Sequence, residues 1–388
     1  MTVVSELRSY PFEPFTGDLP AELLDMVAAE PVSRVRLTDG RPCWLVLGYA
    51  ECCTVLSDPR FGREHVGRPQ VRVSGTRDIS MDGPPHAAVR RVAARAFTAR
   101  QIDGYRPLVQ RHVDELIDAM VAGPQPGDLV SGLVAPLPLR VVCEVTGVPA
   151  ADWEMFYGWL AGINSIVAYG SSDAVTARSE LDAYLAELVR AKRANPGNDL
   201  LSVWTTGSVH DLSDAELVEL AVALLLGGIE VNTTSAGVRA LFQHPGQMEK
   251  LRAAPEKMSA AADEILRFTA VSAMTRVQVV ATDTELGGFA MRAGEYIMPL
   301  GVAGNRDPRV FRDPNVFDID RVQAGPTLAF GYGPHVCLGS ALGKMQVELA
   351  TGALLRRLPA LRPAVPLDEL PWRHDRINCG LKSFPVLW

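Results

Sequence analysis

The sequence predicts a single domain that is mainly α-helical, with small β-sheets. Two observations predict this fold class. An apolar pattern of helical period begins at Leu217 and continues to His244-Pro245, whereas residues 34–47 alternate β-favouring residues around Asp39-Gly40. The chain has 388 residues, 47% hydrophobic and 21% charged, so it can bury a large core. It has no internal repeat and no clean change of composition, and we expect one domain over residues 1–388.

The individual elements follow from local patterns along the chain. Ser213-Asp214-Ala215-Glu216 is a capping box, and the apolar pattern after it predicts a helix of about thirty residues and roughly 45 Å. Such a helix can cross a whole domain. The other expected elements are a hairpin at 34–47, a helix holding Glu264 and Arg267, a short strand near 276–280, a turn-rich segment at 283–299 and an ordered, irregular segment at 305–326.

Charge and cysteine content limit the classes of function. The net charge is −7 and the isoelectric point is near 5.6, which disfavours nucleic acid and anionic membrane as partners and favours a small-molecule substrate. The six cysteines are scattered without a Cys-x-x-Cys pair, which is typical of a reducing cytoplasm. Residues 1–30 lack the apolar run of a signal peptide or membrane anchor. We therefore expect a soluble, cytoplasmic protein.

The most informative segment is the glycine-rich loop from Phe330 to Gly339, which delivers Cys337 just before an amphipathic helix. A thiol at a helix N-terminus has its pKa lowered by the helix dipole and by unsatisfied backbone N–H groups, and the thiolate is the form that binds metals. The glycines let the backbone approach a flat cofactor closely. The pattern indicates that Cys337 is an iron ligand. The alternative is a buried cysteine that packs as a small hydrophobic residue.

On these residues the chain, from about Pro31 to Trp388, resembles a bacterial cytochrome P450 of the soluble, actinobacterial type, a haem-thiolate oxygenase. The resemblance implies the P450 fold, with a long central helix over haem b. It implies that Cys337 is the proximal iron ligand, whose electron donation favours O–O cleavage. Phe330 would then lie beside the sulfur and His335 would reach a haem propionate. Gly331 and Gly339 would belong to the same cofactor-binding loop.

The resemblance assigns further residues to the cofactor and the scaffold. His86 and Arg90 lie one helical turn apart and would bind haem propionates, with Arg276 as a third contact; the alternative is a solvated basic helix start. Glu264 and Arg267 share a helix face and would form a buried structural cluster with Arg321. An isolated pair of this spacing is also common on surfaces. If the cluster is buried, removing one member should be strongly destabilising.

The resemblance also implies a substrate pocket and a redox partner. In an otherwise acidic chain, Arg91, Arg95 and Lys344 form a local basic patch for an acidic ferredoxin, itself reduced by ferredoxin reductase, or they are ordinary solvated side chains. We expect a monomer. The pocket positions describe a mostly apolar site with a few polar groups: Leu226, Ile229, Ser272, Met274, Ile377 and Asn378.

One departure from the family pattern bears on the reaction. The family's central helix carries an acid followed by threonine, which deliver protons to bound dioxygen; here Glu230 keeps the acid but Val231 replaces the hydroxyl. A register shifted by half a turn places Ile229 there, again without a hydroxyl. Two interpretations stay open: the proton relay is weakened, or Val231 only packs against substrate while substrate or water supplies the protons.

These observations predict an enzyme of secondary metabolism that activates O2 at a cysteine-ligated haem. The missing hydroxyl and the closing Phe384-Pro385-Val386-Leu387-Trp388 resemble members that couple aromatic rings of cyclic dipeptides, such as tryptophan-containing ones. The first alternative is hydroxylation or epoxidation of a macrolide, a terpene or an amino-acid-derived compound. The second is a haem-binding or docking protein without turnover, against which the retained Glu230 argues. The substrate, its regiochemistry and the specific redox partner are not encoded in these patterns.

A Val231→Thr substitution tests whether the missing hydroxyl weakens the proton relay. If it does, a restored hydroxyl should raise the fraction of electrons recovered in product and shift the products toward oxygen insertion, because protons reach bound oxygen more readily. Electron consumption and products are measured together for both proteins. Unchanged coupling together with an unchanged product profile would show that the hypothesis is wrong.

Overall fold

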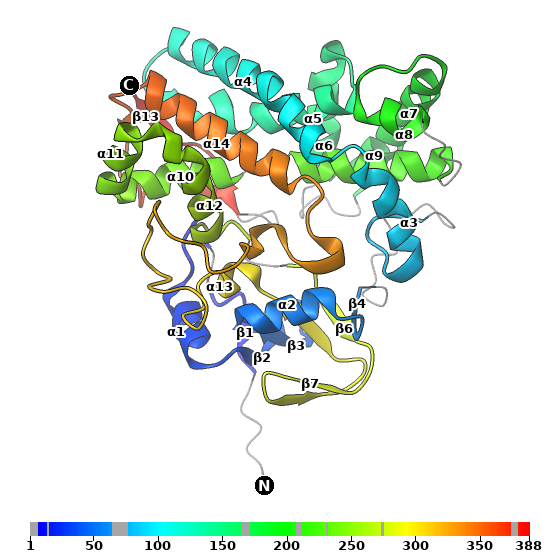
Figure 1. Ribbon diagram of the computed structural model, residues 1–388, viewed down its shortest axis with the longest axis vertical. Coiled ribbons are helices and arrows are strands. Elements are labelled where there is room, and N and C mark those ends of the chain that lie inside the picture. Colours follow the sequence, from blue (N-terminus) through cyan, green and yellow to red (C-terminus); the bar gives the residue numbers. More distant parts are fainter. Residues whose placement is uncertain are drawn as a thin grey trace. The chain divides into compact units, whose positions relative to one another are not determined.

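The structure, a computed structural model, describes residues 7–13, 15–63, 77–163, 171–206, 212–229, 232–272, 275–373 and 379–388. The chain divides into two compact units (Figure 1). The first unit comprises Met1–Gly67, Gln243–Cys337 and Ile377–Gly380, and the second comprises Arg68–Phe242, Leu338–Arg376 and Leu381–Trp388. That residues 1–388 act as one domain stays a prediction.

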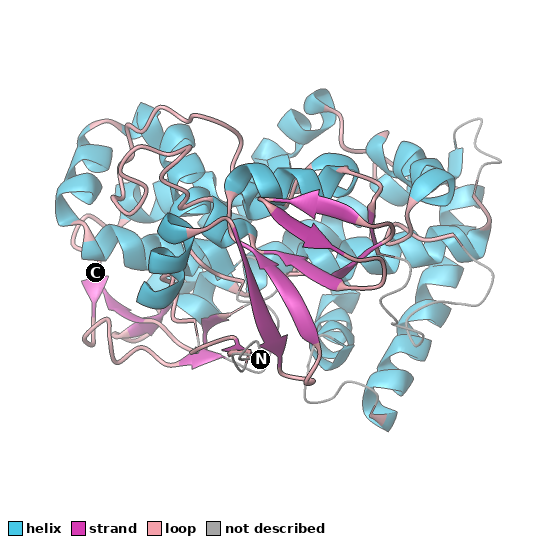
Figure 2. Ribbon diagram, turned by 90° about the horizontal axis from the view of Figure 1, so that it is seen from below, coloured by secondary structure: helices cyan, strands magenta, loops and turns pink. Residues whose placement is uncertain are grey.

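The first unit is built on a six-stranded mixed sheet with strand order β1-β2-β3-β9-β6-β4, drawn in magenta in Figure 2. Strands β2 (Val32–Leu37) and β3 (Pro42–Val46) pair antiparallel, with Val32 opposite Val46. Gly40 in the intervening turn has a φ of +86°, a conformation that glycine adopts without strain. The hairpin predicted over residues 34–47 is therefore confirmed. Strand β9 (Tyr296–Pro299) adds to β3 in parallel.

Helices and short strands complete the first unit. Figure 1 shows α2 alongside the sheet, and one side of the sheet carries the buried cluster of Val46, Cys52 and Ile297. The predicted strand near residues 276–280 is present as β6, and residues 305–326 carry no helix or strand, as predicted. The remaining elements are β1 (Ser9–Tyr10), α1 (Ala21–Ala29), α2 (Tyr49–Ser57), β4 (Phe61–Gly62), α11 (Pro245–Ala253), η3 (Pro255–Lys257), α12 (Met258–Phe268), β6 (Gln278–Val280), β7 (Thr284–Leu286), β8 (Phe289–Met291), α13 (Gly301–Gly304), η4 (Leu328–Phe330) and η5 (Gly333–His335).

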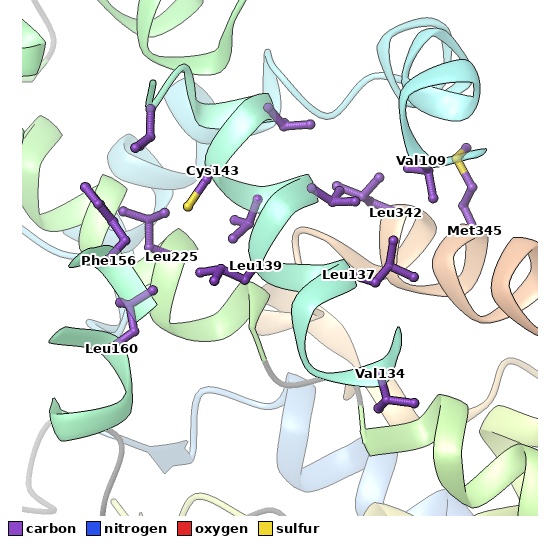
Figure 3. Close-up of a cluster of buried hydrophobic side chains, with 14 of the residues drawn as sticks. Val109, Val134, Leu137, Leu139, Cys143, Phe156, Leu160, Leu225, Leu342 and Met345 are labelled. Atoms are coloured by element: carbon purple, nitrogen blue, oxygen red, sulfur yellow. The ribbon is translucent and has the colours of Figure 1, made fainter. Parts of the chain in front are cut away.

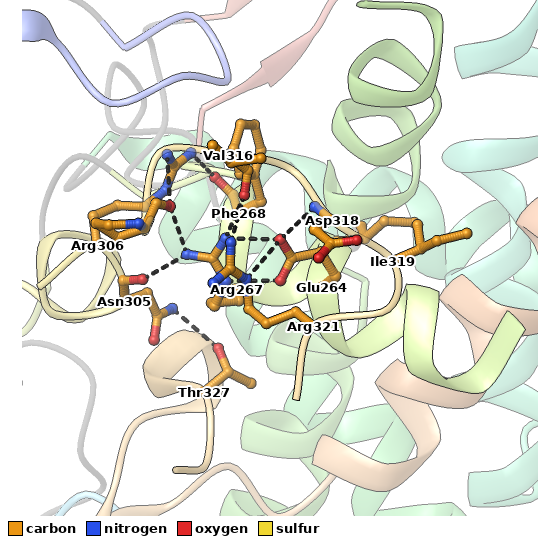
Figure 4. Close-up of polar contacts among 12 residues, drawn as sticks. Glu264, Arg267, Phe268, Asn305, Arg306, Val316, Asp318, Ile319, Arg321 and Thr327 are labelled. Carbon is orange, nitrogen blue, oxygen red and sulfur yellow. Dashed lines mark hydrogen bonds and ion pairs between the residues drawn. The ribbon is translucent and has the colours of Figure 1, made fainter. Parts of the chain in front are cut away.

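A buried ion-pair cluster ties α12 to the irregular segment 305–326 (Figure 4). The Arg267 Nε and Nη2 atoms donate to the two carboxylate oxygens of Glu264, each at 2.7 Å, and Arg321 Nε donates to Glu264 Oε1 at 3.2 Å. Glu264 is 0% exposed and Arg267 1%. The Asp318 backbone N–H also donates to Glu264, at 2.9 Å. The structure thus brings together the three residues that the sequence places in one structural cluster.

Helix α2 supports the irregular segment and the glycine-rich loop from one side. The Tyr49 hydroxyl donates to the Pro326 carbonyl at 2.8 Å, and the buried Asp307 carboxylate accepts from the Tyr49 backbone N–H at 2.9 Å. At its other end α2 meets Gly333, which has a φ of +70°. A Cβ on Gly333 would lie 2.6 Å from the Leu56 carbonyl oxygen, so only glycine allows this approach.

The second unit is a helical assembly around one large hydrophobic core (Figure 3). Phe156 and Leu160 of α6, Cys143 of α5 and Leu225 of α9 meet there, all buried. Helix α14 lies beside α4 (Figure 1). The elements are α3 (Gly83–Ala94), α4 (Ala99–Ala122), β5 (Gly127–Asp128), η1 (Val130–Val134), α5 (Pro136–Thr146), η2 (Ala150–Asp152), α6 (Trp153–Ile163), α7 (Ser172–Ala194), α8 (Leu200–Thr206), α9 (Asp214–Gly228), α10 (Asn232–Gln243), α14 (Ser340–Arg357), β10 (Arg362–Pro363), β11 (Trp372–Arg373), β12 (Gly380–Leu381, which straddles the boundary) and β13 (Pro385–Leu387).

The predicted central helix has both of its expected ends, but its described residues form two helices. α9 begins at Asp214 after the Ser213–Glu216 capping box and ends at Gly228, and α10 runs from Asn232 to Gln243. Two consecutive glycines end α9, and each glycine is about 1 kcal/mol less favourable in a helix than alanine. Gly228 packs closely, because a Cβ there would lie 2.6 Å from Val142 Cγ2. The whole stretch from Asp214 to Gln243 has the thirty-residue length predicted for the central helix, and residues 230 and 231 within it lie outside the described residues.

The start of α9 holds two ion pairs from elsewhere in the second unit. Arg77 Nε donates to Glu216 Oε1 at 2.6 Å, and Arg178 of α7 donates to the buried Glu219 at 2.8 Å. The Ser213 backbone N–H donates to the second Glu216 oxygen at 2.8 Å. The Arg77 guanidinium is the main reason why the Glu216 pKa falls from 4.5 to about 2. Glu216 thus both caps α9 and binds Arg77.

Within the described part of the chain, one stretch is long and apolar enough to cross a membrane, Asp214–Gln243. Half of its most apolar window is buried, and a core helix of a globular protein satisfies the same criteria of length and composition.

The Glu216 contacts predict a specific pH dependence of stability. Because the folded-state pKa lies below the ordinary value, the stabilisation is complete above about pH 4.5 and is lost as the pH falls toward 2. The gap in unfolding free energy between wild type and Glu216→Gln should therefore be large near neutral pH and should have fallen by more than half near pH 3. Urea unfolding at both values measures it. The control is Glu187→Gln, which alters an exposed glutamate paired with Arg190 and should change the unfolding free energy little. If the difference in unfolding free energy between wild type and Glu216→Gln did not depend on pH, the lowered pKa of Glu216 would be contradicted.

Two glycines with positive φ separate backbone strain from steric clash. Gly333→Ala and Gly294→Ala both place alanine in a left-handed conformation, at φ of +70° and +89°, which costs about 1 to 2 kcal/mol. A Cβ at Gly294 meets nothing within 4 Å, whereas one at Gly333 collides with α2. Gly333→Ala should therefore lower the unfolding free energy by a further ~1 to 3 kcal/mol. Equal losses in the two variants would argue against the close contact.

Candidate functional site

The glycine-rich loop is closed by backbone hydrogen bonds within the first unit. The Cys337 N–H donates to the Phe330 carbonyl at 2.8 Å, and the Val336 N–H donates to the Gly333 carbonyl at 3.1 Å. Gly331 has a φ of +73°, and a Cβ there, or at Gly339, would meet nothing within 4 Å. The loop therefore holds Cys337 in a defined place, and the backbone on either side of it faces open space.

Cys337 differs from the other cysteines in its surroundings. It is exposed, whereas Cys43, Cys52, Cys143 and Cys379 are buried and Cys53 is half-buried. Burial raises the pKa of the Cys43 and Cys143 thiols to about 12, and also raises the pKa of the Cys52 and Cys53 thiols. A thiol with a raised pKa is a poor source of thiolate. Cys337 is therefore the best candidate for a thiolate ligand.

The residues near Cys337 fit a haem, judged by their chemistry. Helix α14 begins three residues after Cys337, at Ser340, so its free N–H groups and dipole favour a negative sulfur. Phe330 and His335 are half-buried and supply an aromatic ring and an imidazole at the loop. The open space at Gly331 and Gly339 allows a flat ring to approach the backbone. A sulfur ligand, an aromatic side chain and an imidazole suit an iron porphyrin with carboxylate substituents.

The three donors predicted for the propionates are distributed over both units. His86 and Arg90 lie one turn apart on α3 in the second unit; His86 is buried and Arg90 half-buried. Arg276 lies in the first unit, two residues before β6, and is half-buried. Each is of a type that can bind a carboxylate. Their assignment to haem stays a prediction.

Three of the eight predicted pocket and catalytic residues are described. Leu226 and Ile229 are half-buried at the end of α9 and pack against the core of the second unit. Ser272 lies in the first unit, where the Cys379 N–H donates to the neighbouring Val271 carbonyl at 2.7 Å. That bond brings the segment of Ser272 to the C-terminal turn. The other five lie outside the described residues: Glu230, Val231, Met274, Ile377 and Asn378.

The predicted basic patch lies in the second unit. Arg91 and Arg95 are exposed on α3, and Lys344 is half-buried on α14. Exposed arginines are compatible with binding to an acidic partner and equally compatible with simple solvation.

Sequence analysis missed two polar contacts near these elements. The side chain of Asn305 meets Thr327 and the Leu328 backbone just before the glycine-rich loop, and Arg77 meets Glu216. Each joins positions far apart in the sequence, so no local spacing could reveal it. The available indications were the polar run Asn305-Arg306-Asp307 in an otherwise unpatterned segment, and a capping-box glutamate with a spare oxygen.

Comparison with known proteins identifies the family. The model of the family "Cytochrome P450" matches residues 173–364. The chain is 38% identical over 397 residues to nocardicin C N-oxygenase of Nocardia uniformis subsp. tsuyamanensis, covering 99% of each chain. It is similar to the crystal structure of the LnmA cytochrome P450 hydroxylase from the leinamycin pathway of Streptomyces atroolivaceus S-140, with a TM-score of 0.91, 36% identity and coverage of 98% and 100%.

A second solved structure with similar coverage belongs to a P450 with a different described reactivity. Cytochrome P450mel 107F1, described as having biaryl coupling reactivity, matches with a TM-score of 0.89 and 32% identity over 99% of this chain and 100% of its own. These similarities extend over nearly the whole chain and confirm the predicted fold class, haem cofactor and enzymatic class. The chain is an actinobacterial-type member of the cytochrome P450 family, an oxidoreductase with haem as its cofactor.

Proposed function

We propose that this P450 oxidises a small secondary metabolite with Cys337 as the axial ligand of its haem b iron. The observation that carries the proposal is the contrast among the cysteines. Cys337 is exposed on a hydrogen-bonded loop, whereas burial raises the pKa of the Cys43, Cys52 and Cys143 thiols. When bound, the haem iron supplies the site at which dioxygen is activated. The start of α14 at Ser340 favours the thiolate form of Cys337.

Four basic side chains of the protein are assigned to the haem carboxylates. We assign His86, Arg90 and Arg276 to the propionates, with His335 as an additional donor. Arginine suits this role, because its planar guanidinium binds a carboxylate through two parallel hydrogen bonds. His86 is buried on α3, one helical turn before Arg90, so the two donors lie on one face of that helix.

Glu230 is assigned the task of holding and passing protons toward the oxygen site. Glu230 and Val231 lie outside the described residues, in the chain between Gly228, the last residue of α9, and Asn232, the first residue of α10. Val231 offers no hydroxyl to share the protons, so delivery depends on Glu230 together with water or substrate.

Oxygen insertion is the reaction that the relatives support best. One is named an N-oxygenase and another a hydroxylase, and both share more than a third of their residues with this chain. Leu226 and Ile229, with Met274 and Ile377, would supply apolar contacts to substrate, while Ser272 and Asn378 would supply polar ones. Such a pocket fits a mainly apolar natural product with a few polar groups, such as a macrolide, a terpene or an amino-acid-derived compound.

A second candidate reaction is the oxidative coupling of aromatic rings, for example in a tryptophan-containing cyclic dipeptide. Two observations favour it: the valine at the position of the hydroxyl, and the similarity to a P450 with biaryl coupling reactivity. Insertion adds one oxygen to the product, whereas coupling removes hydrogen and adds no oxygen. Product masses therefore separate the two reactions.

The proposed redox partner is a ferredoxin with its reductase, and the proposed setting is the cytoplasm, with the protein a monomer. The exposed Arg91 and Arg95 support an acidic partner, because the chain as a whole carries a net charge of −7 and these arginines stand out locally. Raised salt should weaken such an association.

A Cys337→Ser substitution tests the ligand assignment. The reduced wild-type protein should give the thiolate-type band in a carbon monoxide difference spectrum, and Cys337→Ser should lose that band, because a hydroxyl is not a thiolate donor. Cys53→Ser, which alters the half-buried cysteine of α2, is the matched control and should keep it.

Retention of the band in Cys337→Ser would assign the thiolate to another residue. Turnover with ferredoxin, reductase and NADPH then tests the reaction. Failure to form any NADPH-dependent product, with ligands that displace the iron-bound water, would contradict the proposed oxidation.

A further inference from the structure

A single buried side chain connects the ion-pair cluster of Glu264 to the start of the Cys337 loop. Asn305 is 0% exposed. Its Oδ1 accepts from the Leu328 backbone N–H at 2.7 Å, and its Nδ2 donates to Thr327 Oγ1 at 3.0 Å. Its backbone carbonyl accepts from Arg267 Nη1 at 2.9 Å. Both ends of the Asn305 side chain and its carbonyl are therefore engaged, as Figure 4 shows in part.

The contacts of Asn305 continue to Cys337 through a short helix. Thr327 begins η4, where its hydroxyl accepts from the Ala329 N–H at 3.2 Å. The Gly331 N–H donates to the Leu328 carbonyl at 2.9 Å, and η4 ends at Phe330. The Phe330 carbonyl then accepts from the Cys337 N–H at 2.8 Å. Asn305 thus fixes Thr327 and Leu328 at the start of η4. The end of the same short helix, Phe330, is hydrogen-bonded to Cys337.

The chemistry of this position favours an amide. Leu328 is 3% exposed, so its N–H requires an acceptor inside the protein. An apolar side chain at 305 would leave that N–H unsatisfied, which is costlier than the loss of an exposed hydrogen bond. Gly301 adds a close contact, because a Cβ there would lie 2.8 Å from the Leu328 carbonyl oxygen. Leu328 is therefore confined both by hydrogen bonding and by packing.

We propose that Asn305 is a positioning residue for the haem ligand: by fixing Thr327 and Leu328, it holds the Cys337 loop in the conformation that presents the sulfur as a thiolate. This inference rests on the proposed ligand role of Cys337. Asn305 acts through η4 and the loop, and has no direct role at the iron. The Asn305 backbone carbonyl accepts from Arg267 and its side chain binds Thr327 and Leu328, so the ion-pair cluster and the ligand loop form one hydrogen-bonded structure.

A purely structural residue would affect stability alone, whereas a positioning residue changes the state of the thiolate. The test therefore follows the thiolate-type carbon monoxide band and its conversion, on mild warming, to the band of a haem without thiolate ligation. Reduction potential is the second readout, since it responds to the donation from sulfur. Neither readout depends on substrate or turnover.

Three variants and one matched control carry the test. Asn305→Leu removes both bonds of the Asn305 side chain. Thr327→Val removes the two bonds that the Thr327 hydroxyl accepts, from Asn305 Nδ2 and from the Ala329 N–H, at a half-exposed residue, so this second variant should fold even if the first does not. Asn305→Asp keeps an acceptor for Leu328, and the Thr327 hydroxyl can donate to its other oxygen. Thr146→Val is the control, because it removes one buried hydroxyl bond, to the Val142 carbonyl at 2.6 Å, in the second unit.

Conversion of the thiolate band should be about fivefold faster for each hydrogen bond lost in Thr327→Val and Asn305→Leu. Asn305→Asp should return close to the wild-type rate. Thr146→Val should lower thermal stability without changing the band or the potential. The inference would be overturned if Thr327→Val and Asn305→Leu both kept the wild-type conversion rate and reduction potential. It would also be overturned if Thr146→Val changed these two quantities by the same amount. A wild-type protein without the thiolate band would instead contradict the proposed function.

Discussion

The first unit depends on the burial of one carboxylate. Glu264 is fully buried and receives four hydrogen bonds, two from Arg267, one from Arg321 and one from the Asp318 backbone. A buried charge without partners is strongly destabilising, so the irregular segment 305–326 is confined to conformations that bring Arg321 and Asp318 to Glu264. This requirement explains how a segment without helix or strand is nevertheless ordered. It also places Asn305 and Thr327, and therefore the start of the Cys337 loop.

The loop itself is defined from two sides by contacts that tolerate little change. On one side Asn305 holds Leu328, and on the other α2 closes on Gly333 so tightly that no Cβ fits. Between these contacts, at Gly331 and Gly339, the backbone faces open space. Tight contact at the back of the loop and open space beside the cysteine suit a rigid support for a flat cofactor, because an axial ligand must be positioned by groups that do not themselves occupy its site.

Features set by local chemistry could be predicted from the sequence, and features set by distant contacts could not. The hairpin at Asp39-Gly40, the capping box at Ser213 and the Glu264–Arg267 pair each depend on residues a few positions apart, so spacing alone indicates them. Asn305 with Leu328, and Arg77 with Glu216, are joined only by the tertiary fold. The close approach of Gly228 to Val142 is a further tertiary contact that the apolar period of the central helix does not contain.

The residues that follow the missing hydroxyl also bear on which reaction the enzyme performs. Along a helix, one residue changes the direction of a side chain by about 100°, so Asn232, Thr233 and Thr234 are not expected to take the place of the missing hydroxyl at Val231. The hydroxyl of Thr234 is buried within α10, which makes it a poor proton carrier, and Asn232 opens α10 with its carbonyl bound to Ser235 Oγ at 2.9 Å. On the proposed assignment, proton supply depends on Glu230 and on water or substrate groups beside it, and a substrate that brings its own hydroxyl or amide would restore what Val231 lacks.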